Sequence, residues 1–275
     1  MHFVQPQPAG NSQEEPGISW HKQLRFKVCS LLVLPCAMSV SSAALPPNNE
    51  PDRLRSLRAH EVLPTLIEPI FDEFVALTAQ VFSLPISLIS VVEEDEVFYP
   101  ANHGMPGNER QPRVEAICST AVQQSRAVVY HDVLLEQVAT LPPEAVQAAQ
   151  ANDLRFYAGA VLRLPDQHPI GTLCIIDRQP RSFSATEQQV LDQLAALISQ
   201  TIAVRHTCLS QARTVPDRWE QLRTLLQEEL RELTALVRYL YTRHGVQIPV
   251  SAELLAQVER RLNDLHALLG EYSCS

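Results

Sequence analysis

Residues 155–177 read RFYAGAVLRLPDQHPIGTLCIID and contain the strongest fold signal in the chain. Two apolar runs rich in β-forming residues flank the segment PDQHP, whose prolines and aspartate favour a turn. Alternate residues of the first run share one strand face, namely Phe156, Ala158, Ala160, Leu162 and Leu164. The second run, residues 170–176, is almost continuously apolar, as in a central strand that is covered on both faces. The stretch therefore predicts a β-hairpin in the middle of a sheet.

Upstream of this hairpin, the sequence predicts two helices and two further strands. Residues 52–63 indicate a first short helix, and apolar side chains at three- and four-residue steps predict an amphipathic helix over residues 67–82. Residues 86–92 and 97–100 are predicted strands that the acidic turn EEDE joins. The polar segment 101–114, with two glycines and two prolines, is expected to be a loop that could lie over a pocket.

Downstream of the hairpin, Ser184 and Glu187 have the spacing of a capping box, S-x-x-E, which marks the head of a long helix. The apolar stripe of this helix consists of Val190, Leu191, Leu194, Leu197, Ile198 and Ile202. Before the hairpin we also expect a helix, a strand and a helix, at residues 115–124, 127–130 and 144–151. Hairpin-connected strands with helices at both ends of the chain predict an α+β fold, an antiparallel sheet flanked by helices.

The segments RFYAG, LRLPD and GTLCIID, followed by PR and the helix opening SATEQQVLDQLAAL, together resemble the C-terminal half of a GAF domain. The subtype is one often found ahead of signalling output domains in bacteria. The resemblance covers roughly residues 50–205, so the predicted GAF domain is 51–205. It implies a GAF-like antiparallel sheet that encloses a small cavity under the 101–114 loop and the helix containing Cys118. It also implies a non-catalytic sensory module that binds a small molecule there and signals through its terminal helices.

Residues 206–275 show no strand signal and predict a C-terminal α-helical hairpin. Its first helix has a stripe made of Trp219, Leu222, Leu226, Leu230, Leu233, Val237 and Leu240. Its second helix, which Ser251 can cap, has a stripe made of Leu255, Val258, Leu262, Leu265 and Leu269. The steps are close to a heptad repeat. Because a solitary hairpin leaves much apolar surface uncovered, we expect it to pack on itself, on the domain, or across a homodimer or partner signalling protein.

Residues 1–50 differ from the rest of the chain and are expected to be a disorder-like or wrongly assigned leader. A basic region, a short apolar core and small residues within residues 20–43 imitate a secretory signal. The apolar run is too short to span a bilayer and contains Pro35. The alternative is that translation begins at Met38. The resemblance to cytoplasmic signalling proteins favours Met38, a cytoplasmic location and no membrane partner, with export as the alternative.

Composition argues against several function classes. The formal net charge is −9 and the basic residues are scattered, which argues against a nucleic-acid partner. The 6 cysteines show no C-x-x-C pair, and no two histidines have the i, i+4 spacing of metal ligands, so we expect no metal or haem. With only 8 glycines, the chain has no glycine-rich phosphate loop, and it contains no GGDEF-like or EAL-like motif.

Two cysteines are candidate ligand-binding residues. Cys118 is followed by Ser119, whereas GAF domains that attach a bilin generally have histidine there, so we expect no bilin. Free methionine sulfoxide reductases share the GAF fold, but Cys118 and Cys174 do not reproduce the contexts of their cysteines. The simplest interpretation of each is a small, buried, inert thiol. A nucleophilic Cys118 in a redox enzyme is the alternative.

Three further candidates lie at the ends of the hairpin strands. If their strand face looks into the cavity, Arg155 could hold an anion and Tyr157 could stack on a ring or hydrogen-bond to it. Alternatively, Arg155 pairs with a nearby acid such as Asp177 and locks the strands together. Asp177 could equally fix the turn before Pro180. A third functional hypothesis is a dimerising scaffold whose cavity is filled by side chains.

Overall fold

The computed structural model describes residues 2, 49–107, 109–135, 141–211 and 217–273. All described helices and strands belong to one compact unit, Ala44–Ser275. The predicted leader, with Met38 and nearly all of residues 1–50, lies outside the described residues. No described helix combines the length and the apolar character that a membrane-spanning segment requires.

The unit is built on a six-stranded antiparallel sheet in the order β3-β2-β1-β6-β5-β4. The strands are β1 (Ile86–Val92), β2 (Glu96–His103), β3 (Arg110–Pro112), β4 (Val128–Tyr130), β5 (Phe156–Arg163) and β6 (Pro169–Asp177). The predicted central hairpin is β5–β6, in which Gly159 pairs with Cys174. Because β6 lies between β1 and β5 and helices cover both sheet faces, its apolar run is buried almost throughout.

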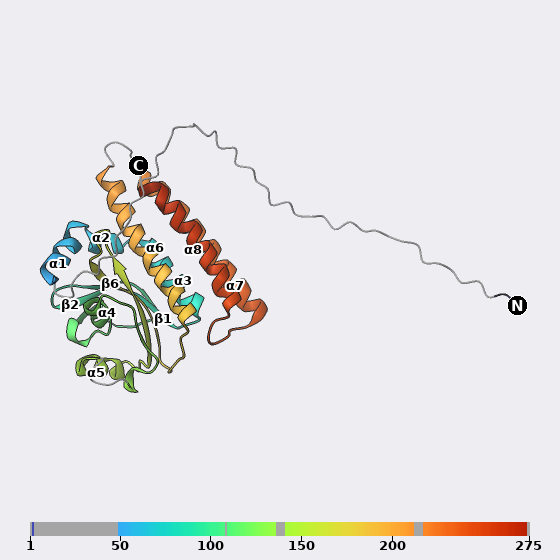
Figure 1. Ribbon diagram of the computed structural model, residues 1–275, viewed down its shortest axis with the longest axis horizontal. Coiled ribbons are helices and arrows are strands. Elements are labelled where there is room, and N and C mark those ends of the chain that lie inside the picture. The colour runs from blue at the N-terminus through green and yellow to red at the C-terminus, as the bar shows by residue number, and fades with distance from the viewer. Residues whose placement is uncertain (1, 3–48, 108, 136–140, 212–216, 274–275) are drawn as a thin grey trace. The chain divides into compact units, whose positions relative to one another are not determined.

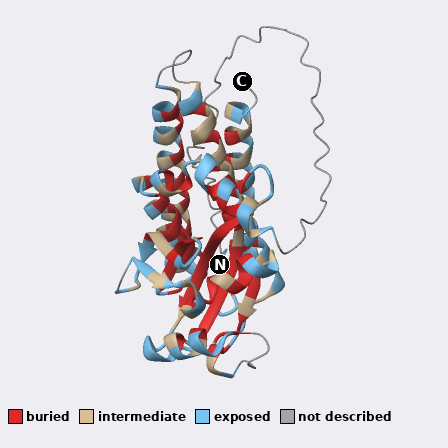
Figure 2. Ribbon diagram, turned by 90° about the vertical axis from the view of Figure 1, so that its left-hand side faces the viewer, coloured by how far each residue is buried: buried red, intermediate tan, exposed pale blue. Residues whose placement is uncertain are grey.

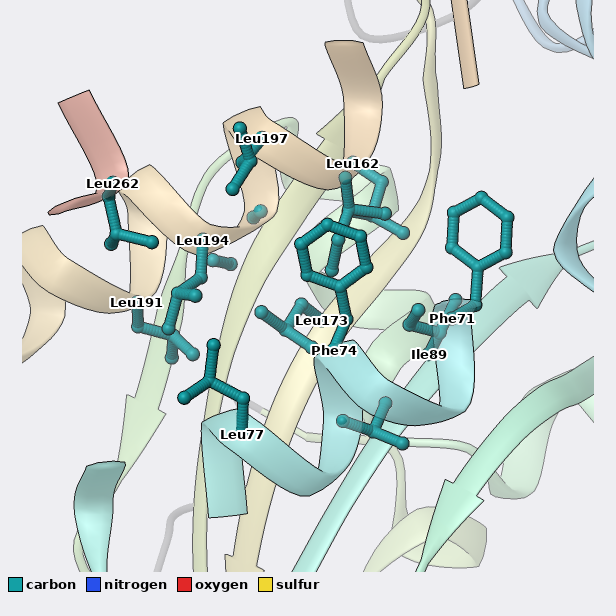
Figure 3. Close-up of a cluster of buried hydrophobic side chains, with 14 of the residues drawn as sticks. Phe71, Phe74, Leu77, Ile89, Leu162, Leu173, Leu191, Leu194, Leu197 and Leu262 are labelled. Carbon is teal, nitrogen blue, oxygen red and sulfur yellow. The ribbon is translucent and has the colours of Figure 1, made fainter. Parts of the chain in front are cut away.

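One face of the sheet is covered by long helices (Figure 1). Helices α3 (Pro69–Phe82) and α6 (Ala185–Ser210) lie on the sheet, and α7 (Arg218–His244) and α8 (Ala252–Ser273) pack on these two helices. Side chains from α3, α6 and the sheet interlock there, with Phe74, Leu173 and Leu194 among them (Figure 3). The predicted capping box is present, because Ser184 accepts from the amide of Glu187 and Glu187 accepts from the amide of Ser184.

The opposite face carries a second apolar cluster under shorter elements. These are α4 (Cys118–Gln124), α5 (Pro143–Ala151) and the 3₁₀ turns η1 (Arg113–Glu115) and η2 (Val133–Leu135), while α1 (Glu50–Ala59) and α2 (Val62–Leu66) precede α3. Successive residues of a strand therefore belong to different cores: Leu173 and Ile175 to the long-helix side, and Cys174 between them to the other. The antiparallel sheet flanked by helices is the α+β fold that the sequence predicts.

The predicted C-terminal helical hairpin is present as α7 and α8, and it packs on the chain's own domain. Helix α8 lies along α6, and α7 lies along α3. Both predicted stripes are buried (Figure 2), and they belong to the core that α3 and α6 share with the sheet. The uncovered surface that motivated a homodimer or partner is therefore largely covered within the chain, and the dimer stays a prediction without that support.

Several predicted boundaries were wrong. The helix at 52–63 is two helices, α1 and α2, and Ile67 ends α2 with 65% of its surface exposed instead of starting α3. The segment 101–114 is only partly a loop, because it contains the end of β2, all of β3 and the start of η1. Strand β3 was missed because its local sequence favours a turn. Its extended conformation depends on pairing with β2. Helix α6 runs to Ser210, and the division between the GAF domain and the tail at residue 205 stays a prediction.

Candidate functional site

A cavity of about 400 Å³ lies on the α4–α5 face of the sheet. Its floor consists of side chains from four strands, Leu88, Tyr99, Tyr157, Cys174 and Ile176. Its walls come from α4, α5 and the segment between β2 and η1, including Met105, Gln111, Cys118, Ala145 and Ala149. The expectation that residues 101–114 and the Cys118 helix border a pocket is therefore confirmed. A volume of this size is in the ordinary range for small-molecule sites.

Tyr157 forms part of the cavity floor and is only 2% exposed. The outer end of its ring lies over Gly159 on the same strand, since a Cβ at Gly159 would come within 2.6 Å of the phenolic oxygen. That oxygen lies 3.4 Å from Thr172 Oγ1. Thr172 Oγ1 in turn lies 2.9 Å from Ser90 Oγ on the neighbouring strand. Tyr157 thus lies flat along the floor because glycine follows two residues later.

Tyr99 connects the floor to the segment over the cavity. Its hydroxyl donates to Gln111 Oε1 at 2.9 Å, and Gln111 Nε2 donates to the carbonyl of Glu115 at 3.0 Å. The same hydroxyl lies 4.0 Å from Cys118 Sγ. Burial raises the pKa of Tyr99 well above its usual range, so the phenol stays protonated and remains a donor. These contacts hold β2, η1 and α4 in a fixed relation around the cavity.

Both predicted cysteines line the cavity. Cys118 is 3% exposed and Cys174 is fully buried. Burial raises the pKa of the Cys118 thiol, and it raises the pKa of Cys174 as well, with the nearby Cys118 adding to the effect. Both side chains are therefore protonated thiols at neutral pH. The structure brings together Cys118, Tyr157 and Cys174, three of the five predicted site residues.

Arg155 and Asp177 do not line the cavity. Arg155 pairs with Asp132 through two hydrogen bonds, one of them 2.8 Å long between Nε and Oδ1. This guanidinium lowers the pKa of the Asp132 carboxyl. The prediction that Arg155 pairs with an acid such as Asp177 was therefore wrong about which acid it is. Asp132, just before η2, lies beside Arg155 at the start of β5. Between Arg155 and Asp177 the structure has only a backbone hydrogen bond, from the Arg155 amide to the Asp177 carbonyl at 2.9 Å.

Asp177 has the turn role that the sequence suggested as an alternative. Its Oδ1 accepts a hydrogen bond from the amide of Gln179 at 3.3 Å, just before Pro180. Tyr99, Gln111 and Met105 were missed as lining residues. For Tyr99 a signal existed, since it follows the apolar Val97 by two residues and so lies on the same face of β2. Gln111 and Met105 carry no such pattern, because their placement depends on the pairing of β3 with β2.

Among the described residues, no group of three or more His, Cys, Asp or Glu side chains is arranged to hold a metal ion. The charged side chains that border the cavity, Arg110 and Glu115, are at its rim. Arg110 is engaged by Glu93 at 2.6 Å and by Glu96 at 3.4 Å, and its guanidinium lies 4.7 Å from the centre of the Phe98 ring. The interior of the site is therefore neutral, with hydroxyl, amide and thiol groups among apolar side chains.

Comparison with known proteins places this architecture in a family. A cyclic di-GMP phosphodiesterase of Pseudomonas aeruginosa is 28% identical over 162 residues, which are 58% of this chain and 27% of that protein. The chain thus spans about a quarter of the length of this curated relative. A GAF domain from an Acinetobacter phosphoenolpyruvate-protein phosphotransferase is 17% identical, with 59% of this chain and 98% of that chain covered and a TM-score of 0.42.

Two further solved structures are similar at the same low level. The blue-light absorbing form of the PixJ GAF domain from Thermosynechococcus elongatus is 17% identical, covering 60% of this chain and 97% of that one, with a TM-score of 0.44. A free methionine-R-sulfoxide reductase from Neisseria meningitidis is 18% identical, covering 62% of this chain and 96% of that one, with a TM-score of 0.42. The sequence model of the GAF domain matches residues 66–202, from the end of α2 into α6. The chain therefore belongs to the GAF domain family.

Proposed function

We propose that this protein is a non-catalytic sensory GAF module that binds a small molecule in the cavity and signals through its terminal helices. One observation carries the proposal: the strands that form the cavity floor also form the platform on which α6 lies. Cys174 of β6 lines the cavity, while its neighbours Leu173 and Ile175 belong to the core shared with α6. A shift of β6 toward a ligand would therefore alter the packing of the helix.

The terminal helices are attached to that platform at several points. Along α6, the side chain of Gln200 lies 2.7 Å from His266 Nδ1 of α8. Near the end of α3, the hydroxyl of Tyr241 in α7 donates to the carbonyl of Val81 at 2.6 Å. A bias in the position of α6 would thus change the docking of the hairpin. The coupling is bounded by the ligand's differential affinity for the two arrangements, typically about 1–3 kcal/mol.

The readout that we propose is a homodimer or a partner signalling protein that contacts α7 and α8. The Pseudomonas relative is named for its action on cyclic di-GMP, and its matched part is a minor share of its length. We infer that the similarity concerns a regulatory module. The GAF module of this protein would then act on a catalytic partner and would not itself hydrolyse a nucleotide.

A cysteine-dependent redox enzyme is the second candidate, because Cys118 and Cys174 face one cavity. Nucleophilic catalysis requires a thiolate, and burial raises the pKa of both thiols. The geometry therefore favours binding over catalysis. A scaffold with a filled cavity is disfavoured by the open volume under residues 101–114.

Native mass spectrometry of protein purified gently from its own host tests the proposal. We expect a reproducible additional small-molecule mass that is lost on denaturation. Ala148→Phe should abolish it, because Ala148 lines the cavity, whereas Gln147→Phe on the exposed side of α5 is the matched control. Hydrogen exchange of α6, α7 and α8 should differ between the loaded and the empty protein.

Two results would contradict the proposal. A bound mass that survives Ala148→Phe unchanged would show that the ligand is elsewhere. Exchange in the three helices that is identical with and without the ligand would show that the cavity and the hairpin are uncoupled. The same spectra report the oligomeric state, and a strictly monomeric protein would exclude the homodimer as the readout.

A further inference from the structure

The described lining residues of the cavity offer no free positive charge to an anionic ligand. Among its described lining residues, Arg110 is the cation, and Glu93 and Glu96 already engage its guanidinium. Glu115 at the rim would repel an anion. An isolated negative charge transferred from water into such surroundings loses hydration that nothing replaces.

Two amides in the first turn of α4 are already bonded within the chain. The amide of Ser119 donates to the carbonyl of Ala116 at 3.1 Å, and the amide of Thr120 donates to the carbonyl of Ile117 at 3.0 Å. Arg155, the cation that the sequence suggested for anion binding, is committed to Asp132 outside the cavity. Among the described lining residues, phosphate and carboxylate groups therefore find no free cation in this cavity.

Tyr157 supplies both a surface and a donor. Its ring lies along the floor above Gly159 and borders the open volume. Its hydroxyl lies 3.4 Å from Thr172 Oγ1, which already lies 2.9 Å from Ser90 Oγ, and it also contacts the thiol of Cys174, a weak acceptor. A buried donor with such weak partners is best satisfied by an acceptor on the ligand.

The remaining walls suit a flat molecule. Helix α5 presents only small side chains to the cavity along most of its length, Ala145, Ala148, Ala149 and Ala151. Stacking on a tyrosine ring favours a planar π-system in an offset or tilted arrangement. Leu88 and Ile176 of the floor add apolar contact area.

We propose that the ligand class of this cavity is a planar ring compound without an anionic group, with a hydrogen-bond acceptor directed at the Tyr157 hydroxyl. Gly159 is the positioning residue, because the missing side chain lets the Tyr157 ring lie flat and leaves space for the ring of the ligand. The inference rests on the proposed function only in assuming that the cavity binds a small molecule. A side chain at Gly159 would push the Tyr157 ring upward and close the space that the ligand needs.

Ligand-observed NMR on the full chain tests this with bicyclic compounds in matched pairs, each as amide and as carboxylate. Indole-3-carboxamide and indole-3-carboxylate are the lead pair, since they differ mainly in charge. We expect amides to bind and the matching carboxylates to bind at least about tenfold more weakly. Gly159→Ala should abolish binding, whereas Gly270→Ala, where an added Cβ meets nothing within 4 Å, should leave it unchanged.

Tyr157→Phe is the second variant, and it keeps the ring while removing the donor. Amide binding should weaken about three- to tenfold, as expected for one lost hydrogen bond. Carboxylates that bind as well as amides would overturn the proposal, as would a panel without a single Gly159-dependent binder. Amide binding without any change in hydrogen exchange of α6–α8 would support the ligand class and contradict the sensory coupling. Carboxylate binding that changes the hydrogen exchange of α6–α8 would contradict the ligand class and support the sensory coupling.

Discussion

The carboxylate of Glu187 accepts a hydrogen bond at 3.1 Å from the backbone amide of Val250, which lies 63 residues further along the chain. The same carboxylate lies 3.0 Å from Arg181 Nη2 and accepts from the amide of Ser184 at 2.7 Å. Arg181 also donates to the carbonyl of Phe82, the last residue of α3. One buried ion pair therefore joins the end of α3, the head of α6 and the residues just before α8.

Glu187→Gln should lower the free energy of unfolding by about 3 kcal/mol or more, because it leaves the buried Arg181 without its counter-charge. Glu187 is fully buried and Arg181 is 6% exposed, so water cannot replace the lost partner. Urea denaturation measures the loss. Glu228→Gln, at an exposed position of α7, is the control and should change stability by less than about 0.5 kcal/mol. Equal effects of the two variants would contradict this role for Glu187.

Only part of the junction around Glu187 can be predicted from the sequence. The spacing of Ser184 and Glu187 predicts the capping box, because both partners belong to one helical turn. Nothing in the sequence indicates that Arg181 and Val250 share the Glu187 carboxylate, since that depends on how α7 and α8 dock. The two faces of β5 follow from alternation, whereas the partner of Arg155 depends on where η2 places Asp132. The sequence therefore predicts features that depend on local periodicity, and it does not predict contacts between distant segments.

Leu262→Ala should destabilise the protein by about 2–5 kcal/mol, since it removes a fully buried side chain from the interface between α8 and α6. Figure 3 shows Leu262 beside Leu191 and Leu194 of α6. Leu225→Ala is the matched control, because Leu225 is 43% exposed on α7. We expect its effect to stay below about 1 kcal/mol. If both variants unfold at the same urea concentration, the hairpin does not dock on α6 in solution.

Glu50 should give the protein a component of stability that depends on pH. Hydrogen bonds from Arg53, with a further contribution from Arg113, lower the pKa of Glu50 from 4.5 to about 2. Because the pKa is lowered in the folded state, the contribution is fully present above about pH 4.5 and is lost as the pH falls towards 2. The side chain is 40% exposed, so solvent screening limits the contribution to about 1 kcal/mol or less.

The measurement for Glu50 is the difference in unfolding free energy between the wild-type protein and Glu50→Gln. This difference should be constant from pH 7 to about pH 5 and shrink between pH 4.5 and pH 3. In an Arg53→Gln background the shrinkage should largely disappear, since the main partner of the carboxylate is gone. A difference that is the same at pH 7 and pH 3 would exclude an ionised, paired Glu50.

Alkylation rates separate the sensory module from a cysteine enzyme. Iodoacetamide reacts with the thiolate, and each unit by which a pKa rises lowers the thiolate fraction about tenfold. Because burial raises the pKa of Cys118 and Cys174, both should be alkylated at pH 7.5 at least about tenfold more slowly than in urea-unfolded protein. Peptide mass spectrometry assigns the rate to each cysteine, and the unfolded chain is the internal control. If Cys118 reacted faster in the folded protein, its thiol would be activated there, and the redox-enzyme hypothesis would replace the binding one.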